Sequence, residues 1–330
     1  MAPTRPDART RLASKVTVPV YRIGISKTAP GERNVSNQQN LWVSLSSGDL
    51  AAEVNPLGAQ LSTLRDRSGR DLLWGGDPSV WSGRAPLLFP IVGALAGGRY
   101  RLGSKIYHLP RHGFARDRVF DVVDTTADTA AFSLKADEAT LRDYPFRFEL
   151  DVRIALDGRN LSVTTRIRNA GDDDMPASFG YHPALRWPLP FGQSRESHFI
   201  EFAGDEPAPI RRLNADGLVT PERQSTPVRH RRLALADSLF HDDVLIFDDI
   251  ESRVVTYGAD DGPRIQVSYP DAPYLGIWTK PGADFICIEP WHGIADAEGF
   301  SGDFREKMGV FTLAAGAALA VRMMIGLIAP

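Results

Sequence analysis

The stretch that most constrains the fold is PFRFELDVRIAL, residues 145–156, because every second side chain from Phe146 onward is apolar. The positions between them carry mostly arginine, glutamate and aspartate. A period of two with one apolar and one charged face is typical of a strand in a half-buried antiparallel sheet. A second alternating run, LSVTTRIRN, follows DGRN, so we predict a hairpin that turns at Asp157 and Gly158.

Short runs of the same kind recur along the chain, separated by turn sequences such as SGD, RSGR and GADDGP. Helical periodicity is scarce, and only residues 137–143 could form one or two helical turns. Strands that follow one another without intervening helices indicate an all-β fold, a large antiparallel sandwich or barrel. The further strands are predicted at residues 41–45, 50–54, 61–64, 118–124, 130–135, 198–203, 253–257, 265–269, 274–279 and 285–289.

The two ends of the chain need separate interpretation. The apolar segment 309–330 is long enough for a membrane helix, but Arg322 would lie well inside it. We therefore expect two strands joined at Gly316 and no membrane contact. Residues 1–38 are polar and rich in basic residues, weakly like a transit segment, and we expect a disordered extension there. Residues 39–330 should then form a single domain.

Composition and missing motifs exclude several classes of function. A net charge of −3 favours neither nucleic acid nor an anionic membrane as partner. The single cysteine, Cys287, allows no internal disulfide and fits a cytoplasmic protein. The chain has no phosphate-binding loop, dinucleotide fingerprint, HExxH or Gly-x-Ser-x-Gly sequence. Nucleotide hydrolysis, hydride transfer and serine-hydrolase chemistry are therefore disfavoured.

Polar chemistry concentrates at three positions. Glu289 stands where the apolar run FICI meets Pro290, and a buried carboxylate is costly unless it is paired, hydrogen-bonded or used. His112 and His182 lie beside glycine or proline, as loop residues at sheet ends do. Two histidines and a carboxylate can supply an acid, a base and an anchor for a sugar. They could also hold a metal, which the absence of HxH or HxxxH spacing makes less favoured, or be structural hydrogen-bonding residues.

Five segments in order carry a family resemblance: APLLFPIVG (85–93), RHGFARD (111–117), FGYHPAL (179–185), LFHDDVLIF (239–247) and IEPWHGIAD (288–296). Together they resemble the aldose 1-epimerase, or galactose mutarotase-like, superfamily over roughly 40–330. The GYHP form of the central motif is similar to that of its bacterial epimerase-like branch. The resemblance implies a large antiparallel β-supersandwich with an open sugar-binding cleft.

The resemblance also implies residue roles. His182 matches the general acid, and Glu289 matches the general base. The two should converge from opposite sides of one hexose-sized cavity. Asp243 matches an aspartate that holds sugar hydroxyls, although Asp242 is adjacent. The classical mutarotases carry Asn-His where this chain has Tyr181-His182. The full set of expected sugar-binding residues is His112, Asp243, Arg84, Arg116, Tyr181 and Trp291.

These roles imply a cofactor-independent isomerase that interconverts the α and β anomers of a hexose, with no metal. We expect a small sugar as its partner and a monomer or homodimer as its assembly. One alternative is a hexose-6-phosphate 1-epimerase with Arg84, Arg111 and Arg116 as a phosphate clamp. Another is a non-catalytic carbohydrate-binding or sensing module, and a third is a metal-dependent β-barrel isomerase.

Overall fold

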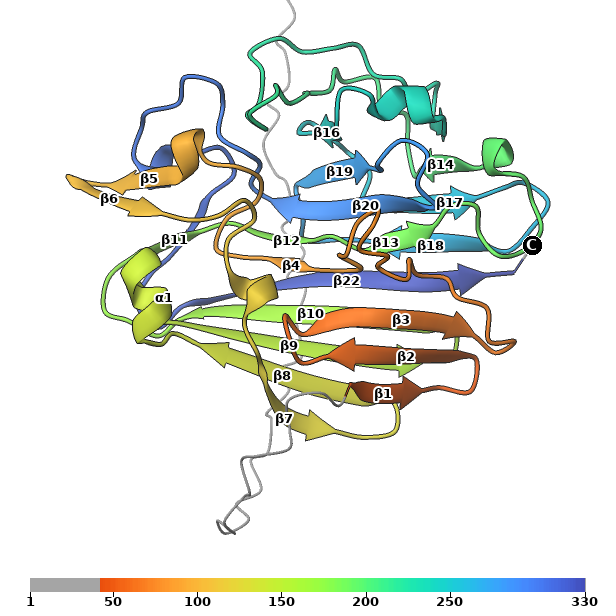
Figure 1. The fold of residues 1–330 in the computed structure, drawn as a ribbon, viewed down its shortest axis with the longest axis horizontal. Helices are drawn as coiled ribbons and strands as arrows, with labels where there is room; N and C mark the ends of the chain where they lie inside the picture. The colour runs from red at the N-terminus through yellow and green to blue at the C-terminus, as the bar shows by residue number, and fades with distance from the viewer. Residues whose placement is uncertain (1–41, 330) are drawn as a thin grey trace, which may run out of the picture. The chain divides into compact units, whose positions relative to one another are not determined.

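The computed structural model describes residues 42–329, which build an all-β sandwich, as predicted (Figure 1). The alternating stretch at its centre forms β9 (Phe148–Asp157), and β10 (Asn160–Asn169) pairs with it antiparallel. The predicted hairpin is confirmed, and Gly158 takes a positive φ of 52° in its turn. The predicted helical turns are α1 (Glu138–Asp143), which Asp137 caps by accepting a hydrogen bond from the Thr140 N–H.

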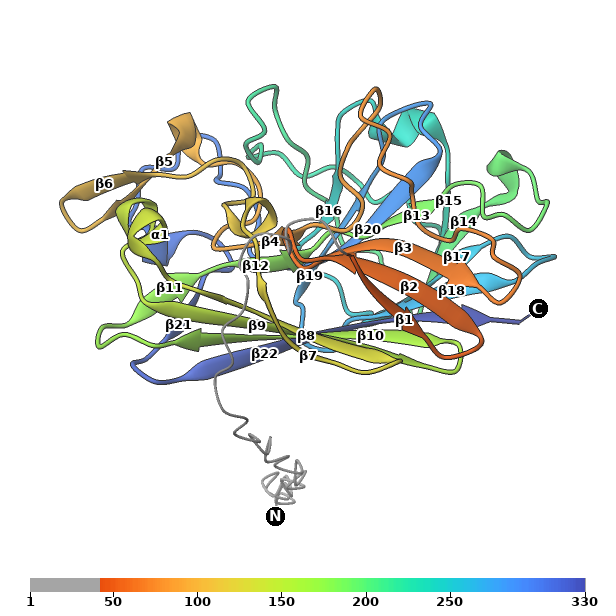
Figure 2. The same ribbon diagram turned by 60° about the horizontal axis from the view of Figure 1, so that its bottom comes forward.

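Nine antiparallel strands form the larger sheet, and its middle strands, β9 and β10 among them, run along the bottom of Figure 2. Successive side chains of each strand point to opposite faces of the sheet, so one face is mainly apolar and the other mainly polar or charged. In spatial order the strands are β15 (Arg232–Ala234), β14 (Phe199–Phe202), β17 (Val254–Gly258), β18 (Arg264–Ser268), β22 (Ala318–Ile328), β10, β9, β8 (Thr129–Lys135) and β7 (Asp121–Thr125).

A six-stranded sheet packs over the larger one, and it carries Glu289 on its central strand and His182 between two of its shorter strands. Ile286 and Ile288 of its central strand share one buried core with Leu150 and Ile154 of β9. This sheet consists of β16 (Leu245–Phe247), β19 (Tyr274–Trp278), β20 (Phe285–His292), β12 (Phe179–Tyr181) and β4 (Leu87–Leu88), and β13 (Ala184–Arg186) also pairs with β20.

Smaller elements complete the sandwich. A three-stranded sheet joins β1 (Val43–Ser46), β2 (Leu50–Asn55) and β3 (Gln60–Asp66), and a hairpin joins β5 (Arg99–Leu102) to β6 (Lys105–His108). β11 (Met175–Ala177) pairs with β21 (Phe311–Leu313).

The apolar C-terminal segment forms β21 and β22, with Gly316 at a φ of 76° between them, as predicted. Arg322 binds Asp271 through two nitrogens at 2.7 and 2.8 Å. Among residues 42–329, no helix is long and apolar enough to cross a membrane. The extension predicted over residues 1–38 lies outside the described residues.

Alternation along β20 determines which side chains leave the core. Ile286 and Ile288 point into the core between the sheets. Phe285 and Cys287 pack instead with Trp74, and Trp291 packs with Leu88 and Ile246. Since successive side chains of a strand point to opposite faces, Glu289 lies with Cys287 and Trp291 on the outer face. The loops above that face build the candidate site.

Candidate active site

A cavity of about 180 Å³ opens over the outer face of β16, β19 and β20. That volume is below the roughly 300–1,000 Å³ typical for drug-sized ligands, so the cavity suits a small ligand. Six of the eight residues predicted from the sequence line it: His112, Arg116, His182, Asp243, Glu289 and Trp291. Residues from segments far apart in the sequence are thus brought together.

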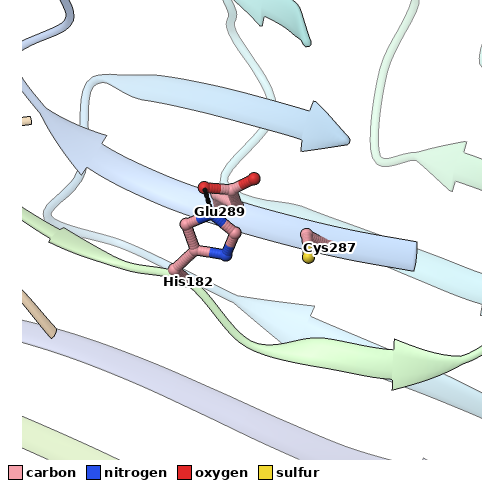
Figure 3. A group of neighbouring side chains, drawn as sticks. All are labelled: His182, Cys287 and Glu289. Atoms are coloured by element: carbon pink, nitrogen blue, oxygen red, sulfur yellow. Dashed lines mark ion pairs between the residues drawn. The ribbon is translucent and has the colours of Figure 1, made fainter. Parts of the chain in front are cut away.

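His182 and Glu289 are direct neighbours in this cavity. β12 and β13 both pair with β20 in one register, with Gly180 opposite Trp291 and Ala184 opposite Cys287. That register puts His182 opposite Glu289, and its Nε2 lies 3.0 Å from Glu289 Oε2 (Figure 3). The expectation that the two groups face each other across the hollow is therefore wrong, because they are cross-strand neighbours on one wall.

Both groups are almost fully removed from water, at 7% exposure for His182 and 1% for Glu289. Burial lowers the pKa of His182 to about 3, with a smaller contribution from the positive charge of Arg116. Burial and then the negative charge of Asp243 raise the pKa of Glu289 well above its usual 4.5. The ligand-free pair is therefore a neutral imidazole beside a protonated carboxyl.

Three buried polar atoms of this cavity have no hydrogen-bond partner within residues 42–329: His182 Nδ1, Glu289 Oε2 and Trp291 Nε1. His182 Nε2 is close to Glu289 Oε2, but the two atoms are not aligned as a hydrogen bond. Unsatisfied buried polar atoms are rare, so each calls for an explanation. A bound ligand rich in hydroxyl groups would satisfy them.

The ring of His112 is held in one tautomer by Gly93, which lies in the loop after β4. Gly93 N–H donates to His112 Nδ1 at 3.1 Å, and His112 N–H donates to the Gly93 carbonyl at 2.9 Å. Burial, His182 and the nearby arginines lower the pKa of His112 well below 6.5. A neutral ring that accepts at Nδ1 carries its proton on Nε2, which can donate to a ligand. His112 itself has a positive φ of 69°.

Asp243, and not its neighbour Asp242, lines the cavity, while Asp242 is exposed. Asp243 has a positive φ of 65°, and its Oδ1 accepts from the Val244 N–H at 2.8 Å. Arg212 Nη1 donates to the Asp243 carbonyl at 3.2 Å and fixes the backbone at that point. The second carboxylate oxygen is thereby left available to hydroxyl groups.

The structure corrects two expected binding residues. Tyr181 points into the core, where its hydroxyl donates to the Val321 carbonyl at 2.7 Å and lies 2.9 Å from Thr165 Oγ1. The reason is alternation, since Tyr181 and His182 are consecutive and cannot both face the cavity. Arg84 donates to the Ser62 carbonyl at 2.8 Å and stacks on Trp42 at 5.0 Å, away from the cavity.

Sequence reasoning missed two aromatic walls of the site, Trp81 and Trp278. The Trp81 ring lies 5.1 Å from the His182 ring at 30°, and the Trp278 ring meets it edge-on at 5.9 Å. Trp278 could have been found, because it alternates with the apolar Leu275 and Ile277 in the predicted strand 274–279 and so faces away from the core. Trp81 lies in a loop and carries no sequence signal.

His182, Cys287 and Glu289 offer three potential metal ligands, whose atoms all lie within 4.8 Å of one another (Figure 3). Cys287 is fully buried, and burial together with Glu289 raises the pKa of its thiol well above 9.0. A thiolate ligand would need that proton removed. The donor set is therefore a poor fit to a resident metal.

The structure is an antiparallel sandwich with a buried histidine–carboxyl pair in the wall of a cavity, and known proteins share this fold. The family model described as aldose 1-epimerase matches residues 42–307. The chain therefore belongs to the aldose 1-epimerase family.

Individual relatives are similar over most of their length. The chromosomal protein LacX of Lactococcus lactis subsp. lactis is 31% identical over 265 residues, which cover 77% of this chain and 89% of that protein. A galactose mutarotase related enzyme from Lactobacillus acidophilus superposes with a TM-score of 0.81 at 29% identity, covering 87% of this chain and 97% of its own. A galactose mutarotase-like protein from Lactobacillus casei also gives 0.81, at 28% identity, with 87% and 99% covered.

Proposed function

We propose that this protein is a cofactor-independent aldose 1-epimerase that interconverts the α and β anomers of a hexose. The observation that carries the proposal is the His182–Glu289 contact at 3.0 Å in the wall of a cavity sized for one sugar ring. An acid and a base in contact with one substrate can act on two oxygens of the same hemiacetal. Membership of the family supports the same reaction.

In the proposed mechanism, Glu289 takes the proton from the C1 hydroxyl while His182 protonates the ring oxygen. The C1–ring-oxygen bond breaks, and its electron pair goes to the ring oxygen as a carbonyl forms at C1. Rotation about C1–C2 presents the other face of the aldehyde. The reverse steps then close the ring and return both protons. Each group contributes on the order of 10²- to 10⁴-fold to the rate.

One shared proton serves this cycle. The resting pair of carboxylic acid and imidazole contains the same number of protons as a carboxylate and an imidazolium. A small rotation that aligns the two atoms, which lie 3.0 Å apart, would let the proton pass from the carboxyl to the imidazole without exchange with solvent. A hydroxyl-rich sugar that hydrogen-bonds the carboxylate, and His112 that donates from Nε2, would favour the charged form.

A phosphorylated hexose is the second candidate substrate, and two arginines favour it. Arg111 and Arg116 both line the cavity. Arg116 donates to the Arg111 carbonyl at 3.0 Å and lies 3.6 Å from the Asp117 carboxylate. The Arg111 guanidinium, in contrast, has no carboxylate within 4.0 Å among the described residues. A free guanidinium at a cavity wall can bind a phosphate. Arg84 takes no part, so the expected three-arginine clamp is reduced to two.

The non-catalytic binding module stays a rival proposal, and it needs no proton donor beside the base. A cytoplasmic location and a monomer or homodimer remain predictions. Exchange NMR on glucose, galactose and their 6-phosphates at equal protein concentration separates these cases. Accelerated α–β exchange for any of the four supports epimerase activity. Binding by calorimetry without acceleration would favour the module instead.

The same assay distinguishes the two substrate classes. If the 6-phosphates are preferred, Arg111→Ala should raise their KM by about tenfold and leave the KM of the neutral sugars nearly unchanged. If the neutral sugars are preferred, the same variant should change both alike.

A further inference from the structure

The Trp291 indole lies flat across three strands of the six-stranded sheet. β20 runs between β12 and β19, with Gly180 opposite Trp291 on one side and Gly276 opposite Glu289 on the other. A methyl group added at Gly276 would lie 2.4 Å from Trp291 Cη2 and 2.6 Å from Cζ2. One added at Gly180 would lie 2.6 Å from Cδ1 of the same ring. The two glycines therefore flank opposite ends of one indole.

Neither glycine is needed for its backbone conformation. Gly180 and Gly276 are absent from the positive-φ glycines of the described residues, so an alanine could adopt both backbones. Glycine inside a strand weakens the strand and often marks a close approach by another group. The group that approaches here is Trp291, and space for its ring explains both glycines.

The ring lies where a substrate would rest. Trp291 lines the cavity, is 5% exposed, and shares a strand face with Glu289 two residues earlier. An aromatic face can cover the apolar C–H face of a pyranose, and the ring edge carries a polar N–H. Trp291 Nε1 has no hydrogen-bond partner within residues 42–329. A ring tilted off the sheet would occupy part of the roughly 180 Å³ that the sugar needs.

We propose that Gly180 and Gly276 are positioning residues, which keep the Trp291 indole flat as the platform for the sugar ring and so determine sugar affinity. The proposal rests on the proposed function, because it names how that same site holds its substrate. Both glycines act through Trp291 and do not themselves touch the reacting atoms.

The test is a double-mutant cycle between residues 276 and 291. Gly276→Ala should raise KM, or the sugar Kd from calorimetry, by about 10- to 100-fold while changing kcat less. Phenylalanine lacks the far ring atoms that the new methyl group would meet. Gly276→Ala should therefore cause little further loss in a Trp291→Phe background, a non-additivity that a general strand defect would not give.

Gly204→Ala is the matched control, since a methyl group at Gly204 meets no atom within 4 Å and its φ is not positive. It should leave KM and melting temperature unchanged. If Gly276→Ala does not fold while the double variant with Trp291→Phe does, the contact is supported, and Trp291→Phe alone then measures the platform. Equal losses from Gly276→Ala in both backgrounds, or an unchanged KM and Kd, would overturn the proposal.

A readout that does not depend on turnover separates this inference from the proposed function. The indole ¹H–¹⁵N resonance of Trp291, assigned by its loss in Trp291→Phe, should shift in Gly276→Ala and not in Gly204→Ala. If wild-type protein accelerates no anomer exchange but this shift and the calorimetric loss occur, the epimerase proposal fails and the platform stands. An unshifted resonance contradicts the platform even in an active enzyme.

Discussion

At the scale of single residues, the proposed reaction depends on the buried contact between His182 and Glu289. Each is buried against its own preference, because burial disfavours the charged form of either group. With the shared proton on the carboxyl, each of the two groups is uncharged. A protein is often less stable with its active-site residues than with substitutes at the same positions, because activity is gained at the expense of stability.

We expect the pH profile of kcat/KM to lack an inflection near 6.5. Burial lowers the pKa of His182 to about 3 and raises that of Glu289, so the one-proton pair persists between these two values. Activity should fall below about pH 3, where the imidazole gains a proton, and on the alkaline side, where the carboxyl loses its proton. Initial rates from polarimetry in low-buffer solutions measure this. A loss of activity centred at pH 6.5 would mean that His182 titrates as an exposed histidine does.

Glu289→Gln should lower kcat by about 10²- to 10⁴-fold without lowering the melting temperature at pH 7. The sign follows from linkage: the folded protein holds the Glu289 proton above pH 4.5, where the unfolded chain releases it, so this group costs stability as pH rises. A glutamine has no proton to release. Calorimetric melts at pH 5 and pH 8 check the point, and a melting temperature several degrees lower than wild type would contradict it.

Sequence alone singled out Glu289 because a carboxylate in an apolar run is costly, and that reasoning depends only on local composition. It could not predict the contact with His182. The contact depends on the register between β20 and the two short strands β12 and β13, which is a tertiary property.

Alternation is the rule at the scale of the element, and it explains what was predicted well and what was not. The ten-residue strands β9 and β10 show several periods and could be identified from the sequence. Strands of two or three residues, such as β4, β12 and β13, show no period at all. The site is built mainly on short strands and loops, so its elements were the hardest to predict.

Tyr181→Phe tests the alternation directly. Its hydroxyl donates to the Val321 carbonyl inside the core, so its loss should cost about 1–2 kcal/mol of unfolding free energy. Because the ring points away from the cavity, KM should stay within about twofold of the wild-type value. Urea unfolding and steady-state kinetics on the same preparation measure both. A raised KM with unchanged stability would mean that Tyr181 faces the sugar after all.

At the scale of the whole molecule, a buried ion pair connects the segment after β20 to the cavity wall. Lys307 Nζ lies 2.7 Å from Asp296 Oδ1, and Asp296 Oδ2 accepts from the Ala96 N–H at 2.9 Å. Asp296 follows Ala295, which lines the cavity. Burial lowers the pKa of Lys307, and the charge of Asp296 opposes that shift. The pair thus holds the loop after β20 against the loop before β5.

Lys307→Met should cost about 3–5 kcal/mol, because it leaves the Asp296 carboxylate buried without its partner. Adding Asp296→Asn should recover part of that loss, since the uncompensated charge is then gone while the amide oxygen can still accept from Ala96. The unfolding free energies of Lys307→Met, Asp296→Asn and the double variant, measured by chemical denaturation, test this. Additive losses would show that the two residues do not depend on each other.

The most direct test of the central claim is α–β exchange measured by NMR on one accepted hexose, with wild type, Glu289→Gln, His182→Asn and the double variant. If the two residues act as one pair, each single variant should lose most of the acceleration, and the double variant should be little slower than either. Circular dichroism should be unchanged in all four. Either single variant retaining wild-type exchange rates, or losses that multiply in the double variant, would contradict the account.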